Sequence, residues 1–544
     1  ILQILMFIIR KEAIVMPKNN ENKFDRYFNL PNPGLRSYFG IVRSGQPEIY
    51  RTPFAKGKDV SDVLQEWLPR VESLSDRWPT LVEFEKDLAK KVGPMSVMKP
   101  LAERMTDIDH YYEDILLSSK PIDHSAVAAV ISEFASLRGL RPRSQQRTVD
   151  IMKKSTNSGS PYFTKRRTVT GKTLPCSVSM QGKELHMDQD DQFWLGAAVL
   201  GWRGQEGGPS PDDVKQRVVW MFPYAVNIEE LTVYQPLIER AQEYDLVPAW
   251  VSMEAVDERI TRMFDSKADG DLVVCTDFSR FDQHFNSVLQ QAAKDILTAV
   301  LDNTPSSKRW LADVFPVKYA IPLAYDYGKI RYGLHGMGSG SGGTNADETI
   351  VHRALQYEAA IKAHQRLNPN SQCLGDDGII TYPGITVEDV VSAYSSHGLE
   401  MNKDKQYASK QDCTYLRRWH HKDYRVNGVC AGVYSTCRAL GRLCEQERYY
   451  DPDEWGPKMV ALRQLSIIEN VKYHPLRDEF ADFCMERDKY RLGLDIPGFL
   501  DNIASEAKKA KDLIPDFLGY TKSQQRHAED GISEWWIVKY LKSK

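Results

Sequence analysis

Three aspartates stand where this chain could hold a divalent cation. Asp376 and Asp377 lie within Cys373–Ile380, where apolar pairs flank Gly-Asp-Asp-Gly, a pattern typical of a β-hairpin with carboxylates at its turn. Asp277 follows Leu272–Cys275, a continuous apolar run that predicts a buried strand. Neighbouring carboxylates repel each other, and a dication bound between them removes that repulsion. The alternative for the hairpin alone is an ordinary surface turn, because Asp-Gly is common in turns.

A glycine-rich segment could approach a ligand through its backbone. Gly336–Thr344 contains no side chain larger than methionine, so its amides are accessible. The pattern that follows predicts a helix over 345–364, and Asn345 with Glu348 fits a capping box at its start. We therefore expect Glu348 to serve mainly as a helix cap.

Two basic stretches are candidates for binding phosphate. Thr156–Pro161 combines hydroxyl side chains with glycine and is followed by Lys165–Arg167, although a solvated loop explains this stretch equally well. Lys215–Arg217 leads into the largely apolar residues 218–223, which predict a strand with Arg217 near its start.

One sheet could bring the aspartates together. The strand at 272–275, the helix at 345–364, the hairpin and a helix predicted over 387–396 follow one another as in a split β-α-β-β-α-β arrangement. That topology places Asp277 and the hairpin turn at one edge of the sheet.

The flanking regions are predicted to be scaffold. Residues 59–140 and the chain beyond 429 have helical apolar periodicity. Residues 19–52 are polar, and Pro31 and Pro33 interrupt them, so we expect an extended arm that wraps a larger body.

Composition places the chain among globular proteins. Of its 544 residues, 42% are hydrophobic and 27% charged, and the net charge is −3, so nucleic-acid binding would depend on local clusters of the 71 Lys and Arg residues. The eight cysteines form no Cys-x-x-Cys pair, which favours reduced thiols. The apolar run over 1–9 is too short to span a membrane, and Met16 is the expected natural start.

In this order and spacing, the motifs resemble those of viral RNA-dependent RNA polymerases, most closely those of picobirnaviruses, which are small double-stranded RNA viruses. The resemblance covers about 156–420. Its motifs are a template-entry segment (Thr156–Pro161), a nucleotide-phosphate arginine (Arg217), a first palm motif (Asp277-x4-Asp282), a second (Ser339-Gly340-x3-Thr344), a third (Gly375–Asp377), a fourth (Asp404-Lys405) and a primer-grip turn (Tyr415–Arg418).

The resemblance implies an α+β right-hand fold of fingers, palm and thumb, with a ferredoxin-like split β-α-β palm and an N-terminal extension. The expected domains are an extension over 1–85 that bridges fingers and thumb, fingers over 86–270 and 286–329, palm over 271–285 and 330–428, and a thumb with C-terminal tail over 429–544. The aromatic and apolar residues 535–541 would pack on the outer thumb or, alternatively, enter the product channel.

The resemblance also implies template-directed RNA synthesis with two Mg²⁺ ions, for which Mn²⁺ is a substitute. Asp277 and Asp376 would ligate the ions, and Asp377 would assist. Lys405 would protonate the leaving pyrophosphate, with Lys403 as the alternative two residues away.

Further residues are expected to bind nucleotide and RNA. Glu348 stands where related positive-strand polymerases carry an asparagine, so Asp282 is expected to read the ribose 2′-hydroxyl with other partners. Those partners and the remaining nucleotide-binding residues are Ser339, Gly340, Thr344, Asn345, Lys215 and Arg217. The RNA-binding residues are Thr156, Ser158, Gly159, Lys165, Arg166, Arg167, Arg417 and Arg418.

The implied partners are RNA template and product, nucleoside triphosphates and the viral capsid protein, with no membrane. The enzyme would transcribe and replicate a viral double-stranded RNA genome in the virion interior and host cytoplasm. A reverse transcriptase is one alternative, but Asp282 replaces its aromatic steric gate, and the hairpin reads Leu-Gly-Asp-Asp rather than Tyr-x-Asp-Asp. A non-catalytic RNA-binding structural protein is the other, and it has no use for Asp277, Asp376 and the glycine loop together.

Overall fold

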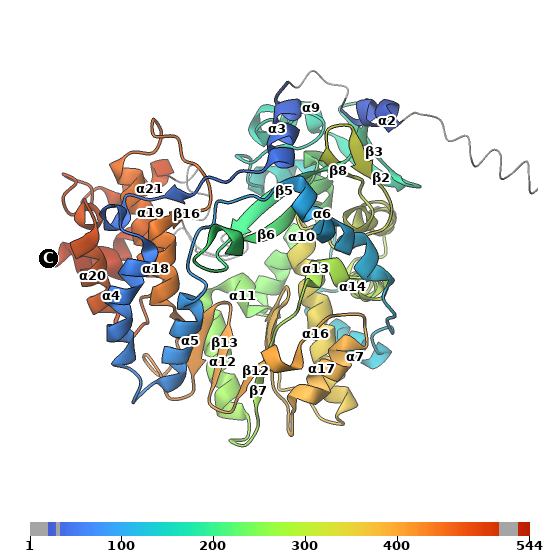
Figure 1. Cartoon of the computed structure of the whole chain (residues 1–544). Helices are drawn as coiled ribbons and strands as arrows, with labels where there is room; N and C mark the ends of the chain where they lie inside the picture. The colour runs from blue at the N-terminus through green and yellow to red at the C-terminus, as the bar shows by residue number, and fades with distance from the viewer. Residues whose placement is uncertain (1–19, 29–32, 511–530) are drawn as a thin grey trace, which may run out of the picture.

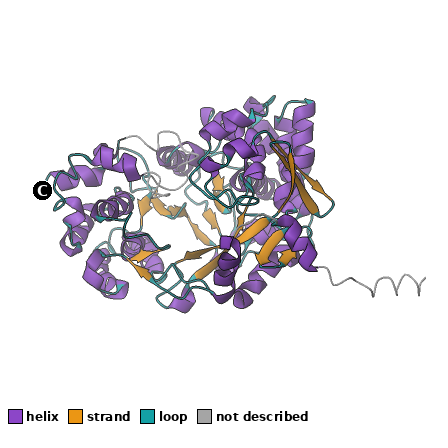
Figure 2. Cartoon of the chain, turned by 90° about the horizontal axis from the view of Figure 1, so that it is seen from above, coloured by secondary structure: helices purple, strands orange, loops and turns teal. Residues whose placement is uncertain are grey.

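The computed structural model describes residues 20–28, 33–510 and 531–544. Figure 1 shows a palm at the bottom, fingers at the upper right and a thumb at the left. Seen from above, most strands lie toward the middle of the molecule, with helices around them (Figure 2). One apolar core runs through palm and fingers and a second fills the thumb. The fold is the predicted α+β right hand.

A four-stranded sheet forms the palm. Its order is β10-β11-β7-β12, and all neighbours are antiparallel. The strands are β7 (Val273–Thr276), β10 (Gln372–Leu374), β11 (Asp377–Ile380) and β12 (Tyr407–Ser409), and the helices between them include α16 (Thr344–Lys362) and α17 (Val387–Ser395). This order is the split arrangement predicted from the sequence, and all four residues of β7 are buried, as its apolar run indicated.

The fingers contain two sheets, of order β6-β5-β8-β9 and β2-β3-β4. Their strands are β2 (Cys176–Gln181), β3 (Glu184–Gln189), β4 (Gln192–Gly196), β5 (Ala198–Gln205), β6 (Lys215–Met221), β8 (Leu323–Asp326) and β9 (Lys329–Arg331). The helices of fingers and palm are α6 (Leu101–Glu113), α7 (His124–Glu133), α8 (Gln145–Ile151), α9 (Thr170–Thr173), α10 (Tyr224–Glu243), α11 (Pro248–Val251), α12 (Met253–Ser266), α13 (Phe281–His284), α14 (Ser287–Val300) and α15 (Pro305–Arg309). β6 confirms the strand expected near Arg217.

The thumb is helical, as its periodicity predicted. It contains α18 (Thr436–Cys444), α19 (Pro457–Glu469), α20 (Arg477–Arg487), α21 (Ile503–Ala510) and α22 (Trp536–Lys542). A sheet of β13 (Asp412–Tyr415), β14 (Arg418–His421) and β15 (Val433–Tyr434) contacts the palm strands and leads into it.

The N-terminal segment differs from the expected extended arm. It forms two helices, α2 (Asn20–Tyr27) and α3 (Pro33–Ser44). Pro33 begins α3, where a missing backbone N–H costs nothing, so the proline starts a helix instead of preventing one. Phe24 and Phe39 supply the apolar contacts that hold these helices on the fingers.

The chain then crosses from the fingers to the thumb (Figure 1). Its next elements are β1 (Tyr50–Arg51), α4 (Val60–Glu72) and α5 (Pro79–Ala89), and β1 pairs with β16 (Glu445–Gln446) of the thumb. α4 and α5 both contact α18. Among the described residues, no helix is both long and apolar enough for a membrane span.

Candidate active site

The Gly-Asp-Asp segment forms the tight hairpin that the sequence predicted. Leu374 pairs with Asp377, which leaves Gly375 and Asp376 as the two-residue turn between β10 and β11. Gly375 has φ +58°, a left-handed conformation that glycine adopts without strain. The carboxylate of Asp376 therefore stands at the tip.

Side chains of α16 hold the backbone of this hairpin. The Gly375 N–H donates to Thr349 Oγ1 at 2.9 Å, and His352 Nδ1 donates to the Gly375 carbonyl at 2.9 Å. One turn further along, Gln356 Nε2 donates to the carbonyls of Gln372 and Ile379 at 2.9 and 3.2 Å. These polar residues recur every three or four positions on one helix face, a spacing from which a supporting role could have been inferred but was not.

The strand register brings Asp277 to the hairpin. Thr276 of β7 pairs with Gly378 of β11, so Asp277 and Asp377 are the next residues on the two neighbouring strands. Asp377 Oδ2 accepts a hydrogen bond from the Leu416 N–H at 2.8 Å, which fixes the second hairpin aspartate toward β13. The three aspartates singled out from the sequence thus meet at one end of the palm sheet.

This gathering of carboxylates alters their acidity. Although Asp376 is exposed at the tip, partial desolvation by the surrounding protein and the charge of Asp282 raise its pKa to about 6, with Asp277 acting in the same direction and Arg217 against it. Burial and Asp376 raise the pKa of Asp377 to about 7. Such repulsion is relieved by a cation.

The donor set suits magnesium. Carboxylate oxygens are the ligands that Mg²⁺ prefers, and an ion between Asp277 and Asp376 would offset the repulsion that raises the pKa of Asp376. Within residues 20–28, 33–510 and 531–544, no three His, Cys, Asp or Glu side chains already surround a common point. The aspartates therefore fit the ion by chemistry and position, and nucleotide phosphates would complete its coordination.

The glycine loop packs tightly between β6 and α10. A Cβ on Gly340 would lie 1.6 Å from the Trp220 carbonyl oxygen, so only glycine fits there. The Ser339 hydroxyl donates to the Val218 carbonyl at 3.3 Å. The Thr344 hydroxyl donates to the Gly338 carbonyl at 3.2 Å, so the hydroxyls of both predicted nucleotide-binding residues also shape the loop.

A buried carboxylate of α10 anchors the same loop. Glu230 is fully buried and accepts hydrogen bonds from the Gly342 N–H at 3.1 Å and from the Ser341 hydroxyl. Asn227 Nδ2 donates to Glu230 at 3.1 Å and to the Gly340 carbonyl at 3.3 Å. Nothing in the sequence of this predominantly buried helix marked these two residues.

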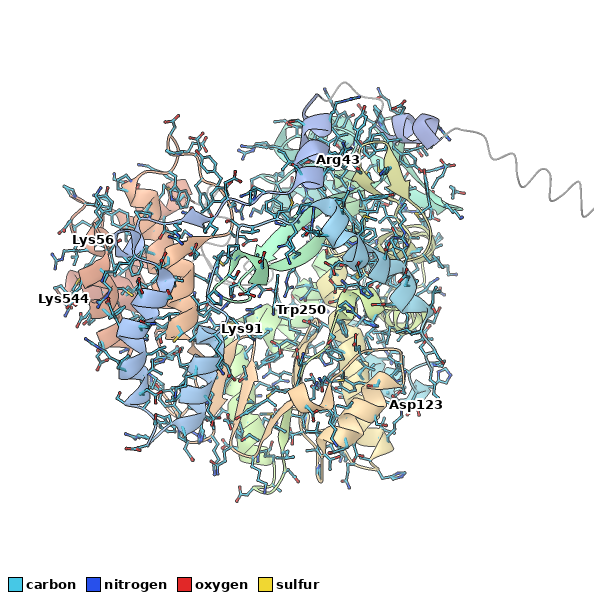
Figure 3. All side chains as sticks on the ribbon, in the orientation of Figure 1. Arg43, Lys56, Lys91, Asp123, Trp250 and Lys544 are labelled. Atoms are coloured by element: carbon cyan, nitrogen blue, oxygen red, sulfur yellow. The ribbon has the colours of Figure 1, made fainter. Side chains whose placement is uncertain are left out.

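The predicted capping box is wrong. α16 begins one residue earlier than expected, with Gly343 at its N-cap and no side-chain cap hydrogen bond. Asn345 Oδ1 instead accepts a hydrogen bond from Trp250 Nε1 at 2.8 Å. Trp250 lies in the middle of the molecule (Figure 3).

Glu348 lies beside Asp282. It is 5% exposed, and its Oε2 is 3.6 Å from the position of a Cβ on Gly375. Burial raises the pKa of Glu348 well above its usual range, and the neighbouring Asp282 carboxyl acts in the same direction. The raised pKa favours the uncharged form of Glu348, which relieves the repulsion between the two carboxyl groups.

Positive side chains gather near the aspartates, where Arg217 acts on the pKa of Asp376 and Arg417 on that of Asp377. Partial burial and the charges of Lys91, Arg217 and Arg417 lower the pKa of Lys215. Figure 3 shows Lys91 beside α5, at the boundary between the thumb side and the fingers. The carboxylate of Glu206 lies among these cations, and its Oε1 is 3.7 Å from Arg417 Nη1. Lys91 was not identified from the sequence, since it lies far from every motif.

The other predicted RNA-binding residues differ in exposure. Thr156, Lys165 and Arg167 are exposed, whereas Ser158 is buried and accepts a hydrogen bond from the Thr164 N–H at 3.1 Å. Arg166 Nη2 donates to Asn227 Oδ1 at 2.7 Å. The remaining two positions are Gly159, packed on the Phe222 backbone, and Arg418, which lies over the Tyr434 ring at 5.6 Å.

The fourth motif forms a short turn next to Asp277. Residues Lys403–Lys405 make a 3₁₀ turn. Lys403 Nζ lies 2.8 Å from Glu388 Oε1, so its charge is already paired. The exposed Lys405 side chain makes no hydrogen bond or ion pair within the part of the chain that the structure describes.

Comparison with known proteins agrees with this geometry. Residues 211–431 match the family model for viral RNA-dependent RNA polymerase. A "Potential RNA-dependent RNA polymerase" of Human picobirnavirus (strain Human/Thailand/Hy005102/-) is 65% identical over 529 residues, 96% of this chain and 99% of the relative. The crystal structure of a human picobirnavirus RNA-dependent RNA polymerase matches with a TM-score of 0.92 and 66% identity, covering 96% of this chain and 99% of the other. Its insertion-loop deletion mutant matches with a TM-score of 0.91 and 64% identity over the same shares.

Proposed function

Because this chain belongs to the viral RNA-dependent RNA polymerases, and its relatives are those of picobirnaviruses, we propose that it transcribes and replicates a double-stranded RNA genome by two-metal nucleotidyl transfer. The observation that carries the proposal is the β7–β11 register, which sets Asp277 beside the Asp376–Asp377 hairpin. Raised pKa values at Asp376 and Asp377 support it, because they mark carboxylates that need a cation.

Asp277 and Asp376 would hold the ions, and Asp377, anchored on the Leu416 N–H, would support them. Two bound Mg²⁺ ions, or Mn²⁺ in their place, activate a primer 3′-hydroxyl and neutralise the triphosphate. The chain itself orients the reactants: Arg217, Lys215 and Arg417 present positive charge to the phosphates. Lys405 donates a proton to the departing pyrophosphate, since Lys403 is paired with Glu388.

Sugar recognition is assigned to the Asp282–Glu348 pair. A protonated glutamic acid offers both a donor and an acceptor, as the amide of an asparagine does. With Glu348 protonated, Asp282 can accept from the ribose 2′-hydroxyl while Glu348 supports it.

RNA template and product would contact the exposed Thr156, Lys165 and Arg167 and the primer-grip residue Arg417. We further assign it to the virion interior, where it would meet a packaged genome in contact with the capsid protein, and to the host cytoplasm during transcription.

The direct test replaces Asp277 or Asp376 by asparagine, which keeps size and removes charge. RNA synthesis by the full-length protein on a primed template should fall at least a hundredfold, because losing a metal ligand removes several kcal/mol of transition-state stabilisation. RNA binding, measured by fluorescence anisotropy, should be unchanged. Retention of more than about a hundredth of the wild-type rate would contradict the metal assignment.

A further inference from the structure

The backbone of Asp277 is held by a side chain from another strand. The Asp277 N–H donates to Gln406 Oε1 at 2.7 Å, and Gln406 Nε2 donates to the Asp277 carbonyl at 2.9 Å. One amide group thus pairs with both polar groups of a single residue. The planar amide of a glutamine side chain presents the donor and the acceptor that such a pair requires.

The end of a strand explains why this contact exists. β12 pairs with β7 from Ser409 to Tyr407, where Tyr407 faces Cys275. The chain then turns away into residues Lys403–Lys405, so no backbone remains to pair with Asp277. The Gln406 side chain takes the place of the missing strand.

The same amide is also tied to the turn that carries Lys405. Gln406 Nε2 donates to the Asn402 carbonyl at 2.9 Å, and the Lys405 N–H donates to that same carbonyl at 3.1 Å. Just beyond Asp277, the Ser279 N–H donates to the Glu400 carbonyl at 3.0 Å. Asp277 is therefore braced by the segment that precedes β12.

We propose that Gln406 is a positioning residue, which sets the orientation of the Asp277 carboxylate by fixing the backbone on both sides of its Cα. The hydrogen-bonded N–H and carbonyl flank the two backbone dihedral angles of Asp277, so holding both fixes the direction of the Cα–Cβ bond. The inference rests on the proposed metal role of Asp277. Residues that orient a metal ligand typically change metal affinity or activity by 10- to 100-fold when they are removed.

The contact is suited to positioning more than to stability. Gln406 is only partly buried, and it touches Asp277 through polar groups at the end of a strand. Its loss should lower Tm by no more than about 2 °C in a chain of this size.

The test compares Gln406→Met, which keeps the length and removes the amide, with Gln411→Met. Gln411 is exposed on the same segment and its side chain makes no hydrogen bond within the described residues. Single-nucleotide incorporation on a primed template gives the maximal rate and the apparent nucleotide Kd. Electron paramagnetic resonance of Mn²⁺ gives metal affinity independently of activity.

Gln406→Met should lower the maximal rate and weaken Mn²⁺ binding by about 10-fold each, with the nucleotide Kd, RNA affinity and Tm nearly unchanged. Gln411→Met should match the wild type. Gln406→Asn keeps the amide, but the shorter side chain cannot reach Asp277, so this variant should show the same loss. It therefore serves as a second test if Gln406→Met fails to fold.

Wild-type rate and Mn²⁺ affinity in both Gln406 variants would overturn the proposal, as would parallel losses of rate, RNA binding and Tm. Asp277→Asn, measured alongside, separates a failure of the metal assignment from a failure of the role proposed for Gln406. If Asp277→Asn still synthesises RNA, the metal assignment itself fails, whereas an inactive Asp277→Asn with unimpaired Gln406 variants rejects only the role of Gln406.

Discussion

At the scale of single residues, protonation decides what Glu348 can do. A charged glutamate beside Asp282 would repel the aspartate, but burial favours the neutral form of Glu348, and a neutral carboxyl can act as a hydrogen-bond donor. Glutamine offers a donor at the same position, whereas leucine offers none.

We therefore expect Glu348→Gln to keep most of the preference for ribonucleotides, and Glu348→Leu to lower it by on the order of 10-fold or more. Asp282→Ala should lower it further, because Asp282 is the proposed direct acceptor of the hydroxyl. Competition between ribo- and deoxyribonucleotides in single incorporation measures this preference. Full discrimination by Glu348→Leu at unchanged Tm would remove Glu348 from sugar recognition.

Two lysines near the active site differ in their surroundings, and that difference predicts which one acts as an acid. Lys403 is paired with Glu388 at 2.8 Å, whereas Lys405 has no such partner among the described residues. Lys405→Leu should slow incorporation by on the order of 10²-fold, the usual contribution of a general acid, with little change in nucleotide Kd. Lys403→Leu is the matched control, and a loss confined to it would move the role by two residues.

At the scale of elements, the sequence predicted the palm strands well because each carries a local signature. The buried strand before Asp277 is a continuous apolar run, and the hairpin turn needs the glycine that precedes Asp376. Where α16 begins is not a local property. Gly340 packs on the Trp220 backbone and Glu230 binds the loop, so tertiary contacts set the first turn of the helix and leave Glu348 free to face Asp282.

Another element pair, α5 and α18, is joined by a buried carboxylate. Glu85 accepts hydrogen bonds from the N–H groups of Thr436 and Cys437 at 2.8 and 3.1 Å, at the start of α18, and from His474 Nε2 at 2.8 Å. Burial alone would raise the pKa of Glu85, but these bonds lower it to about 2.

The pKa of Glu85 is lower in the folded than in the unfolded protein. The contribution of Glu85 to folding stability is therefore complete above about pH 4.5 and is lost as the pH falls toward 2. Glu85→Gln should destabilise the protein by about 1–3 kcal/mol at pH 7, because buried donors lose the acceptor that pairs with them, and by less below pH 4.5. Thermal unfolding across this range measures the difference. Glu83→Gln, at an exposed position of the same helix, should change Tm little, and a pH-independent deficit in Glu85→Gln would contradict this account.

At the scale of the whole molecule, the N-terminal and C-terminal segments both contribute to the thumb. The N-terminal segment runs from the fingers to α18, a path that no periodicity in 19–85 could predict because it depends on pairing across almost 400 residues, as between Tyr50 and Gln446. The C-terminal segment 535–541 was predicted to pack against the rest of the protein, either on the outer thumb or in the product channel.

The structure places this segment on the thumb. Ile537, Val538 and Leu541 are fully buried in the thumb core, and the Ile537 N–H donates to Glu469 of α19 at 2.9 Å. The end of the chain lies at the outer edge of the thumb, beside α20 (Figure 1). The alternative of entry into the product channel is therefore wrong for these residues.

Ending the chain at Asp530 should consequently act through stability. It removes four buried apolar side chains, Ile532 in addition to the three above, each of which contributes about 1.5–3 kcal/mol, so Tm should fall clearly. Primed and unprimed RNA synthesis should decline together, since the thumb loosens without any change in the active site. Val538→Ala should reproduce part of the loss, and Lys539→Ala, at an exposed position of the same helix, should not. A selective loss of unprimed synthesis at unchanged Tm would instead give the C-terminal helix a role in initiation that its packing does not support.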